Sequence, residues 1–243
     1  MTGVVRGKRN FSRLYAKGLR QKTCQKSRLI KLSFLDFPFS MFISFEGIDG
    51  CGKTTQLELL EAHLKQREYS VCRTREPGGT SLAETIRHYL LHSPDALEAR
   101  AELLLFGAAR AQHVAQVIRP ALARNEIVLS DRFTDSSLAY QGGGLNLDSS
   151  FIRAMNSFAT DHLQPDITFF LDIDPQIGQT RRAGEKADRI EARGMKFQDR
   201  VRNAFLEIAR IEPQRFLVLN ADQTRENLHS EIIEILSGRG LNL

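Results

Sequence analysis

Short apolar runs alternate along the chain with longer stretches in which apolar residues return every three or four positions. Runs of the first kind lie at 42–46, 69–74, 126–130, 167–172 and 216–220. Their length and the turn residues around them are typical of strands, whereas the longer spacing is typical of helices. We therefore expect helices at about 54–67, from Thr80 or Ser81 to about 91, over 97–124 and at about 225–236.

This alternation of strands and helices predicts an α/β fold, a doubly wound parallel sheet of about five strands flanked by helices. Ligands of such sheets bind beyond the carboxyl ends of the strands. The 243 residues suffice for one substantial domain and require no second one. No apolar run reaches membrane-spanning length, so we expect a soluble, cytoplasmic protein without a membrane partner.

The net charge of +5 is unevenly distributed. Residues 1–40 hold ten basic residues and one acidic residue, which leaves 24 basic and 28 acidic residues in 41–243. The mildly acidic body argues against a nucleic-acid partner, because a polyanion needs clustered positive charge on the folded part. We expect 1–40 to be a disordered basic extension: an upstream start before a functional start at Met41, a transit-type peptide, or a tethering arm.

Three cysteines, Cys24, Cys51 and Cys72, form no C-x-x-C pair and have no histidine at metal-ligand spacing. Neither a disulfide framework nor a zinc site is therefore predicted, and a reducing compartment fits best.

A phosphate-binding loop, G-x-x-x-x-G-K-[ST], lies between the first predicted strand and the first predicted helix. It consists of Gly47, Ile48, Asp49, Gly50, Cys51, Gly52, Lys53, Thr54 and Thr55. Glycines let the backbone N–H groups converge on one point, toward which the positive end of the following helix also faces. We expect Lys53 to reach the outer phosphates of ATP and the Thr54 hydroxyl to bind Mg²⁺.

Asp131 and Arg132 directly follow the strand at 126–130, so they should lie beside this loop. A carboxylate there can hold the Mg²⁺ shell, and the arginine would face the phosphates. Farther back, Phe106 and Arg110 share a helix face, where a ring and a guanidinium could stack on a nucleobase and bind its edge. Taken alone, Phe106 and Tyr140 suit a core position better than a base platform.

The chain resembles the bacterial thymidylate kinase family from about Met41 to the C-terminus. The similarity is carried by the segments 45–55, 74–80 (TREPGGT), 104–110 (LLFGAAR), 131–142 (DRFTDSSLAYQG) and 188–191 (DRIE), which occur in order and at matching spacing. The resemblance implies transfer of the ATP γ-phosphoryl group to dTMP, a step toward dTTP for DNA replication, in a homodimer with a mobile lid at about 178–193.

The resemblance also implies roles for individual residues. Phe106 would stack on thymine, Arg110 would bind the base edge, and Ser137 and Gln141 would read its remaining polar atoms. Tyr140 would lie near the sugar and disfavour a 2′-hydroxyl. The dTMP phosphate would be held by Arg87 and Arg132, and Asp49 and Glu76 would lie near the sugar and acceptor. The implied catalytic residues are Lys53, Arg132, Arg189 and Asp49.

Family members carry a catalytic arginine either in the phosphate loop or in the lid. The loop position is Gly50 here, so the resemblance implies a lid arginine, with Arg189 as the first candidate and Arg181 and Arg182 as the others. Glycines at 178, 184 and 194 could act as pivots. Another departure is Cys51, where the family usually has a small inert residue. Its position at a helix N-terminus suggests either simple steric equivalence or an acidic thiol that reacts faster than Cys72 and is protected by ATP.

Two other functions remain open from the residues themselves. Another P-loop kinase, such as a deoxynucleoside kinase, would also carry an Asp-Arg element, although two phosphate-directed arginines favour a monophosphate acceptor. A nucleotide-driven switch is disfavoured, because the chain has no N-K-x-D element and no acidic pair after the Asp131 strand.

Overall fold

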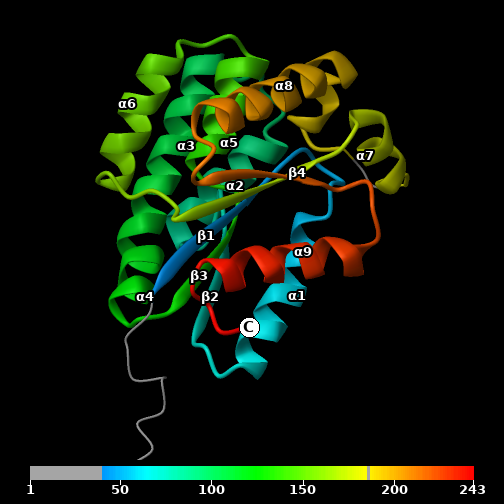
Figure 1. The fold of residues 1–243 in the computed structure, drawn as a ribbon. Helices are drawn as coiled ribbons and strands as arrows, with labels where there is room; N and C mark the ends of the chain where they lie inside the picture. The colour runs from blue at the N-terminus through cyan, green and yellow to red at the C-terminus, as the bar shows by residue number, and fades with distance from the viewer. Residues whose placement is uncertain (1–39, 185–186) are drawn as a thin grey trace, which may run out of the picture. The chain divides into compact units, whose positions relative to one another are not determined.

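The computed structural model describes residues 40–184 and 187–243, and its centre is a parallel sheet (Figure 1). The strands are β1 (Met41–Glu46), β2 (Val71–Arg75), β3 (Ile127–Asp131), β4 (Ile167–Asp172) and β5 (Phe216–Asn220). Their order is β2-β3-β1-β4-β5, and every neighbouring pair runs parallel. Because β1 lies between β3 and β4, later strands were added on both sides of it, which confirms the predicted doubly wound sheet.

Helices cover both faces of the sheet, with α1 and α9 on one face and α3, α6 and α8 on the other (Figure 1). The helical segments are α1 (Lys53–Gln66), α2 (Ser81–His92), α3 (Ala99–His113), the π-helical η1 (Val114–Ile118), α4 (Arg119–Ala123), α5 (Thr134–Ser137), the π-helical η2 (Leu138–Gly144), α6 (Ser149–Thr160), α7 (Pro175–Arg181), the 3₁₀-helical η3 (Glu191–Arg193), α8 (Met195–Ile211) and α9 (Arg225–Gly238).

The predicted helix over 97–124 corresponds to α3, η1 and α4, which follow one another without a gap. Pro120 directly follows the π-helical turn η1, in which the Arg119 N–H bonds to the Val114 carbonyl five residues back, so the regular hydrogen-bond pattern is already interrupted where the proline lacks an N–H. The chain then turns at Asn125, which has a left-handed φ of 59°. Neither α6 nor α8 was among the predicted helices, and both lie on the face of the sheet that α3 covers (Figure 1).

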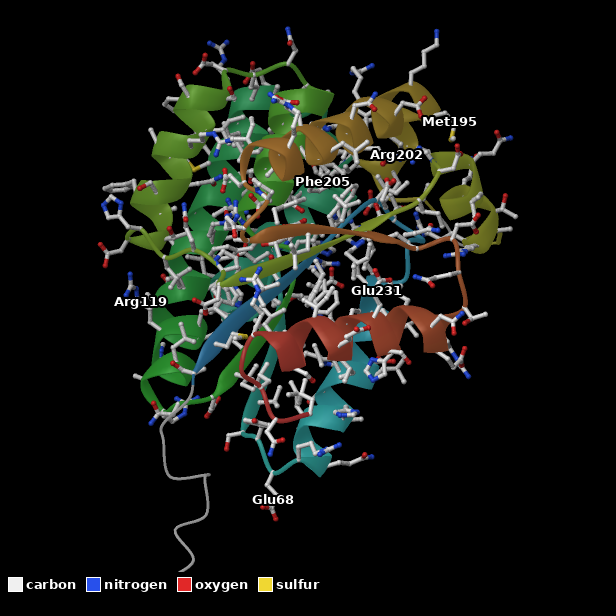
Figure 2. All side chains as sticks on the ribbon, viewed as in Figure 1. Glu68, Arg119, Met195, Arg202, Phe205 and Glu231 are labelled. Atoms are coloured by element: carbon white, nitrogen blue, oxygen red, sulfur yellow. The ribbon has the colours of Figure 1, made fainter. Side chains whose placement is uncertain are left out.

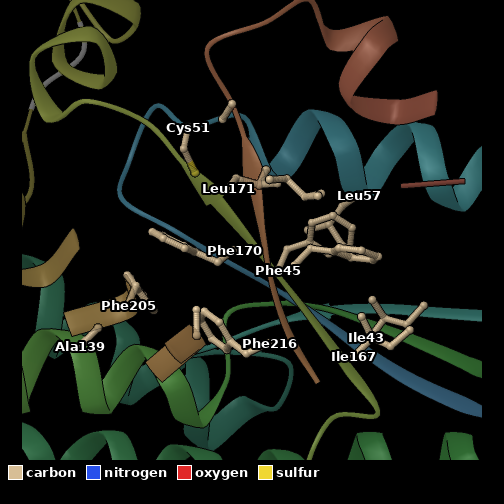
Figure 3. Close-up of a cluster of buried hydrophobic side chains, with 14 of the residues drawn as sticks. Ile43, Phe45, Cys51, Leu57, Ala139, Ile167, Phe170, Leu171, Phe205 and Phe216 are labelled. Carbon is tan, nitrogen blue, oxygen red and sulfur yellow. The ribbon is translucent and has the colours of Figure 1, made fainter. Parts of the chain in front are cut away.

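Aromatic packing fixes α8 on the sheet. The ring of Phe205 stacks on that of Phe170 in β4, with centroids 4.9 Å apart, and on that of Phe216 in β5 at 6.2 Å (Figure 3). One turn earlier in the same helix, Arg202 (Figure 2) donates two hydrogen bonds, of 2.6 and 2.9 Å, to Asp172 at the carboxyl end of β4. These contacts hold the segment that precedes α8 above the carboxyl ends of the strands.

Within residues 40–184 and 187–243, no helix is long and apolar enough to cross a membrane. The same residues contain no group of three or more His, Cys, Asp or Glu that could hold a metal ion. The predicted N-terminal extension lies outside the described residues, apart from position 40.

Candidate active site

The phosphate loop joins β1 to α1 at the carboxyl edge of the sheet. Three of its glycines have backbone conformations that L side chains rarely adopt: Gly47 at φ 141°, Gly50 at 82° and Gly52 at 97°. Gly52 also precedes the first residue of α1 in the left-handed conformation. The loop therefore needs glycine for its curvature, and it directs the N-terminus of α1 at the space in front of it.

Lys53 stabilises this loop through its ammonium group. Its Nζ donates hydrogen bonds of 3.1 Å to the carbonyl oxygens of Gly47 and Ile48 and lies 4.0 Å from Asp49 Oδ1. The side chain is buried, so the charge is held inside the loop rather than in open solvent. A ligand phosphate entering the loop would meet a cation that is already in place.

A close backbone contact links the phosphate loop to α7. A Cβ built on Gly50 would overlap the carbonyl oxygen of Gly178, and a Cβ on Gly178 would lie 2.8 Å from the carbonyl oxygen of Asp49. Gly178 is therefore a packing residue inside α7, which corrects the suggestion that it could serve as a pivot. Gly184 and Gly194, in contrast, have left-handed φ values and open space around them.

In front of the loop lies a cavity of about 880 Å³. Its wall includes loop residues 49–55, the strand-end residues Asp131 and Arg132, Arg87 from α2, and Arg181 and Arg182 at the end of α7. Ala221, Gln223, Arg225 and Leu228 close its far side. A space of this size with six arginines and a lysine on its wall suits a nucleoside triphosphate.

The oxygen atoms of Thr54 and Asp131 meet at this cavity. Thr54 Oγ1 lies 3.4 Å from Asp131 Oδ2, which brings together a hydroxyl and a carboxylate from two different segments. Hard cations such as Mg²⁺ prefer oxygen ligands and are commonly bound by one or two protein groups together with substrate phosphates and water. The pair therefore fits Mg²⁺, with the remaining ligands supplied from outside the protein.

A second cavity of about 140 Å³ adjoins the first. Asp49, Glu76, Arg87, Arg132 and Glu191 line both. The residues lining only the smaller cavity include four of the predicted base and sugar contacts: Phe106, Ser137, Tyr140 and Gln141. The structure thus brings most of the predicted donor and acceptor residues together at two adjoining cavities, with Arg110 and Arg189 among the exceptions.

Arg132 lies at the junction of these cavities. Its guanidinium donates to Asp49 Oδ1 at 2.6 Å and to the Gly47 carbonyl at 2.8 Å, and it lies 5.0 Å above the ring centre of Tyr140. Burial would raise the pKa of Asp49, but Arg132 and Lys53 outweigh it and hold that pKa below its usual range. The carboxylate is therefore ionised at neutral pH and keeps both cations oriented.

The turn that carries Arg132 is held by Glu46, a residue that the sequence analysis did not single out. Glu46 is fully buried at the end of β1 and accepts hydrogen bonds from the N–H groups of Phe133 and Ser136 and from the Ser136 hydroxyl. Burial and the nearby Asp135 raise its pKa to about 7. Glu46 therefore fixes the backbone at Arg132, whose φ of 71° is uncommon for a residue with a side chain.

Arg110 differs from the expectation that it contacts the base. It is 2% exposed and does not line the smaller cavity. Its guanidinium donates to Glu76 Oε2 at 2.8 Å, and its other partners are Ser137 Oγ, Asn156 Oδ1 and the Phe133 carbonyl oxygen. Arg110 therefore supports the pocket from beneath, while Glu76 and Ser137 line it.

Residues of α3 and η2 form part of the smaller cavity. Phe106 is partly buried on α3, and Tyr140 and Gln141 are buried in η2. A π-helical turn is an uncommon feature that often occurs at functional sites. Arg87 completes the mouth of the pocket and is anchored by a 3.0 Å hydrogen bond to the Pro77 carbonyl.

The lid arginines also differ from the expectation. Arg189 donates to Glu102 Oε2 at 2.6 Å and to the Leu90 carbonyl, and it lines neither cavity. Arg181 and Arg182 line the larger cavity instead, and Arg182 pairs with Glu191 at 2.7 Å. Arg181 and Arg182 therefore lie on the cavity in front of the phosphate loop, whereas Arg189 contacts α3. The predicted lid at 178–193 spans the end of α7 and η3, and its residues 185–186 lie outside the described part.

Cys51 does not have the surroundings expected of a reactive thiol. It is 1% exposed and its sulfur is turned into the apolar cluster near Leu171 (Figure 3). Burial raises the pKa of this thiol, and the nearby cations Lys53 and Arg132 offset only part of that effect. Cys72 lies on β2, at the edge of the sheet, and is only partly buried. The hypothesis of an acidic, accessible Cys51 and a buried Cys72 is therefore wrong.

We expect iodoacetamide to alkylate Cys72 faster than Cys51, because access to the sulfur limits the reaction when both thiols are protonated. Peptide mass spectrometry after timed labelling would measure both rates, with Cys24 followed as a separate peptide. ATP should not change the labelling rate of Cys72, which lies outside both cavities, and Cys72 should remain the faster of the two cysteines. Earlier labelling of Cys51 would contradict this burial argument.

Comparison with known proteins identifies relatives whose family matches the one that the sequence segments around this site resemble. A family model described as thymidylate kinase matches residues 45–232. The chain is similar to a thymidylate kinase of Bifidobacterium longum, with 50% identity over 196 residues that cover 79% of this chain and 95% of the relative. It is also similar to one of Fervidobacterium nodosum, with 44% identity, covering 81% and 98%. A crystal structure of thymidylate kinase from Ehrlichia chaffeensis superimposes with a TM-score of 0.70 at 39% identity, covering 82% of this chain and all of the other.

Proposed function

This chain belongs to the thymidylate kinase family, and we propose how its residues divide the work of the family's reaction. The enzyme transfers the γ-phosphoryl group of ATP to dTMP. The bond between that phosphorus and the β-phosphate oxygen breaks, a bond to a dTMP phosphate oxygen forms, and ADP and dTDP are released.

The observation that supports this division best is the junction of the two cavities. The larger cavity begins at the phosphate loop and the smaller one ends at Phe106, and Arg132 borders both. Phosphoryl transfer requires mainly that the two phosphates be brought into line and that the charge on the transferring group be stabilised. A cation at the junction can contact both phosphates, and Asp49 keeps it in place.

On the donor side we assign the loop residues 47–55 to the ATP phosphates, with Lys53 as the main cation. Arg182 is our choice for the lid arginine, because it lines the larger cavity and its partner Glu191 orients it. Arg181 also lines that cavity but reaches the Ala221 carbonyl, which suits it to the nucleoside end. Arg189 is assigned a positioning role rather than a catalytic one.

On the acceptor side we assign Arg87 and Arg132 to the dTMP phosphate and Phe106 to stacking on the base. Tyr140 would lie against the sugar, and Ser137 and Gln141 would bind the polar edge of the base. Glu76 borders the same space and is held by Arg110 and His113. Arg110 would contribute by holding Glu76 and Ser137 in place.

We propose Mg²⁺ as the metal that accompanies ATP. Thr54 and Asp131 would hold it, and their oxygen atoms, 3.4 Å apart, fit this cation. When bound, the ion would neutralise negative charge on the phosphates.

A direct assay tests the assignment of the acceptor. ADP formation from ATP and Mg²⁺ would be measured with dTMP, dUMP, CMP, AMP and thymidine as alternative acceptors. We expect dTMP to be preferred, because a wrong base would leave buried polar groups unpaired at a cost of about 1–3 kcal/mol each. Comparable kcat/KM values for CMP or AMP would overturn the specificity, and turnover with thymidine alone would favour a deoxynucleoside kinase.

We also propose a homodimer, supported by large apolar side chains that are exposed on α2, α3 and α6. Helix α3 packs between the other two, and the exposed side chains on the three helices are Leu82, Tyr89, Leu104, Phe151 and Phe158. An exposed apolar face of this kind is typical of a protein interface. Sedimentation equilibrium would give twice the chain mass of 27.5 kDa if this is right and the chain mass if it is wrong.

Residues 41–243 are proposed to be the complete kinase domain. The matched relatives are covered over 95–98% of their length by about four fifths of this chain, which supports an activity that does not need 1–40. A protein that lacks 1–40 should keep its cooperative melting and its turnover.

Because ATP and dTMP are its substrates, we place the enzyme in the cytoplasm, which cell fractionation would test.

A further inference from the structure

Glu102 is a fully buried carboxylate next to the base pocket. It lies on α3, one turn before Phe106, with 0% of its surface exposed, and it lines neither cavity. A buried carboxylate is costly unless it is paired and hydrogen-bonded. Its partners therefore indicate why it is there.

Three side chains donate to the two Glu102 oxygens. Oε2 accepts from Arg189 Nη2 at 2.6 Å and from Arg193 Nη2 at 2.5 Å. Oε1 accepts from Gln141 Nε2 at 3.0 Å and from Arg193 Nη1 at 3.2 Å. Burial raises the pKa of Glu102, but the hydrogen bonds from Arg193, Gln141 and Arg189 outweigh it and bring that pKa below its usual range. The group is ionised at neutral pH.

An ionised carboxylate can only accept hydrogen bonds, and this determines the orientation of the Gln141 amide. The nitrogen must face Glu102, so the amide oxygen is the end left for the pocket that Gln141 lines. With Glu102 in place, the pocket therefore presents a hydrogen-bond acceptor at this point.

We propose that Glu102 is the positioning residue that selects the base, by holding Gln141 with its oxygen toward the ligand. This inference rests on the proposed function. Thymine and uracil carry a ring N3–H, which can donate to the Gln141 oxygen. Cytosine has an unprotonated N3, so two acceptors would face each other. Arg189 and Arg193 supply the positive charge that keeps Glu102 buried and ionised.

Substitution of Glu102 by glutamine should reverse this polarity. The Oε2 position receives two short hydrogen bonds from arginines, of 2.6 and 2.5 Å, whereas Oε1 receives one longer arginine contact of 3.2 Å from Arg193, so the glutamine oxygen is best placed at Oε2. The NH₂ group of the new side chain would then face Gln141. The Gln141 amide would turn so that its oxygen accepts from this NH₂ group and its nitrogen faces the pocket. That nitrogen is a donor, which suits the N3 of cytosine and opposes the N3–H of thymine.

The test is the ratio of kcat/KM values for dTMP, dUMP and dCMP in the wild type and in Glu102→Gln. We expect the ratio of dTMP to dCMP to fall by about 10- to 100-fold, which corresponds to one misoriented buried hydrogen bond. The ratio of dTMP to dUMP should stay within about twofold, since both bases carry N3–H. Because each ratio is measured on one preparation, an inactive fraction cancels.

Two further variants serve as controls. Glu102→Asp keeps an acceptor-only group and should retain most of the preference for dTMP over dCMP. Glu207→Gln changes an exposed carboxylate on α8 that pairs with Arg210, and it should leave every ratio unchanged. If Glu102 only supports the fold, Glu102→Gln will lower kcat/KM for all three acceptors equally, and the inference is then wrong. A wild type that does not prefer dTMP would instead refute the proposed function itself.

Discussion

Replacing Lys53 by alanine is expected to lower kcat for dTMP phosphorylation by about 1,000-fold or more. The ammonium group is the only lysine cation on the wall of the larger cavity, as far as the chain is described, and it is already held inside the phosphate loop by the Gly47 and Ile48 carbonyls. A fixed charge aimed at the transferring phosphoryl group acts mainly in the transition state, so its loss reduces kcat. Initial rates at saturating ATP and dTMP would measure the effect.

The matched control is Lys65→Ala on the same helix. That ammonium is exposed and pairs with Glu61 one turn earlier, so we expect kcat within about twofold of the wild type. Thermal melting of both variants would show that the loop variant is folded. Retention of more than a tenth of the wild-type kcat in Lys53→Ala would exclude the role assigned to this residue.

Arg132→Ala should lower kcat/KM for dTMP by about 100- to 1,000-fold. Unlike Lys53, this arginine borders both cavities, and its loss would also release Asp49 from a 2.6 Å ion pair. We therefore expect KM for dTMP to rise and kcat to fall together. Arg132→Lys should recover only part of the loss, because an ammonium group cannot bind Asp49 and a phosphate with a planar fork.

Arg124→Ala provides the comparison for Arg132. Arg124 precedes β3, is exposed, and pairs with Glu126 at 2.7 Å. Steady-state kinetics with varied dTMP should give the Arg124→Ala variant the same kcat and KM as the wild type. If Arg132→Ala changed KM for ATP alone, Arg132 would belong to the donor site only.

The strands could be predicted from the sequence because each is a short apolar run with a turn on either side. The runs at 167–172 and 216–220 coincide with β4 and β5. Helices α6 and α8 were not predicted, although each carries an amphipathic pattern. Phe197, Val201, Phe205 and Ile208 repeat at helical spacing in α8, so its signal was present. In α6 the apolar residues Phe151, Ile152, Met155 and Phe158 also repeat at helical spacing, although its buried face includes the polar residues Asn156 and Thr160.

The phosphate loop could also be predicted, since its residues are consecutive. The surroundings of Arg110 could not, because its partners come from residues 76, 133, 137 and 156, which only the folded chain brings together. The same applies to Arg189, which has a partner on α3 that is 87 residues away. The sequence does carry one sign of Glu46 and Glu102, because each is an acidic residue within an otherwise apolar strand or helix face. Such residues merit attention in related sequences.

The contact between Gly50 and Gly178 limits how this enzyme can evolve. An arginine at position 50 would have to adopt a φ of about 82° and would displace the backbone of α7. With Arg182 as the proposed lid arginine, moving that charge to the phosphate loop would require at least two changes, of which the first alone would disturb the contact with α7. We therefore expect this chain to accept an arginine at position 50 only together with a compensating change in α7 that makes room for it.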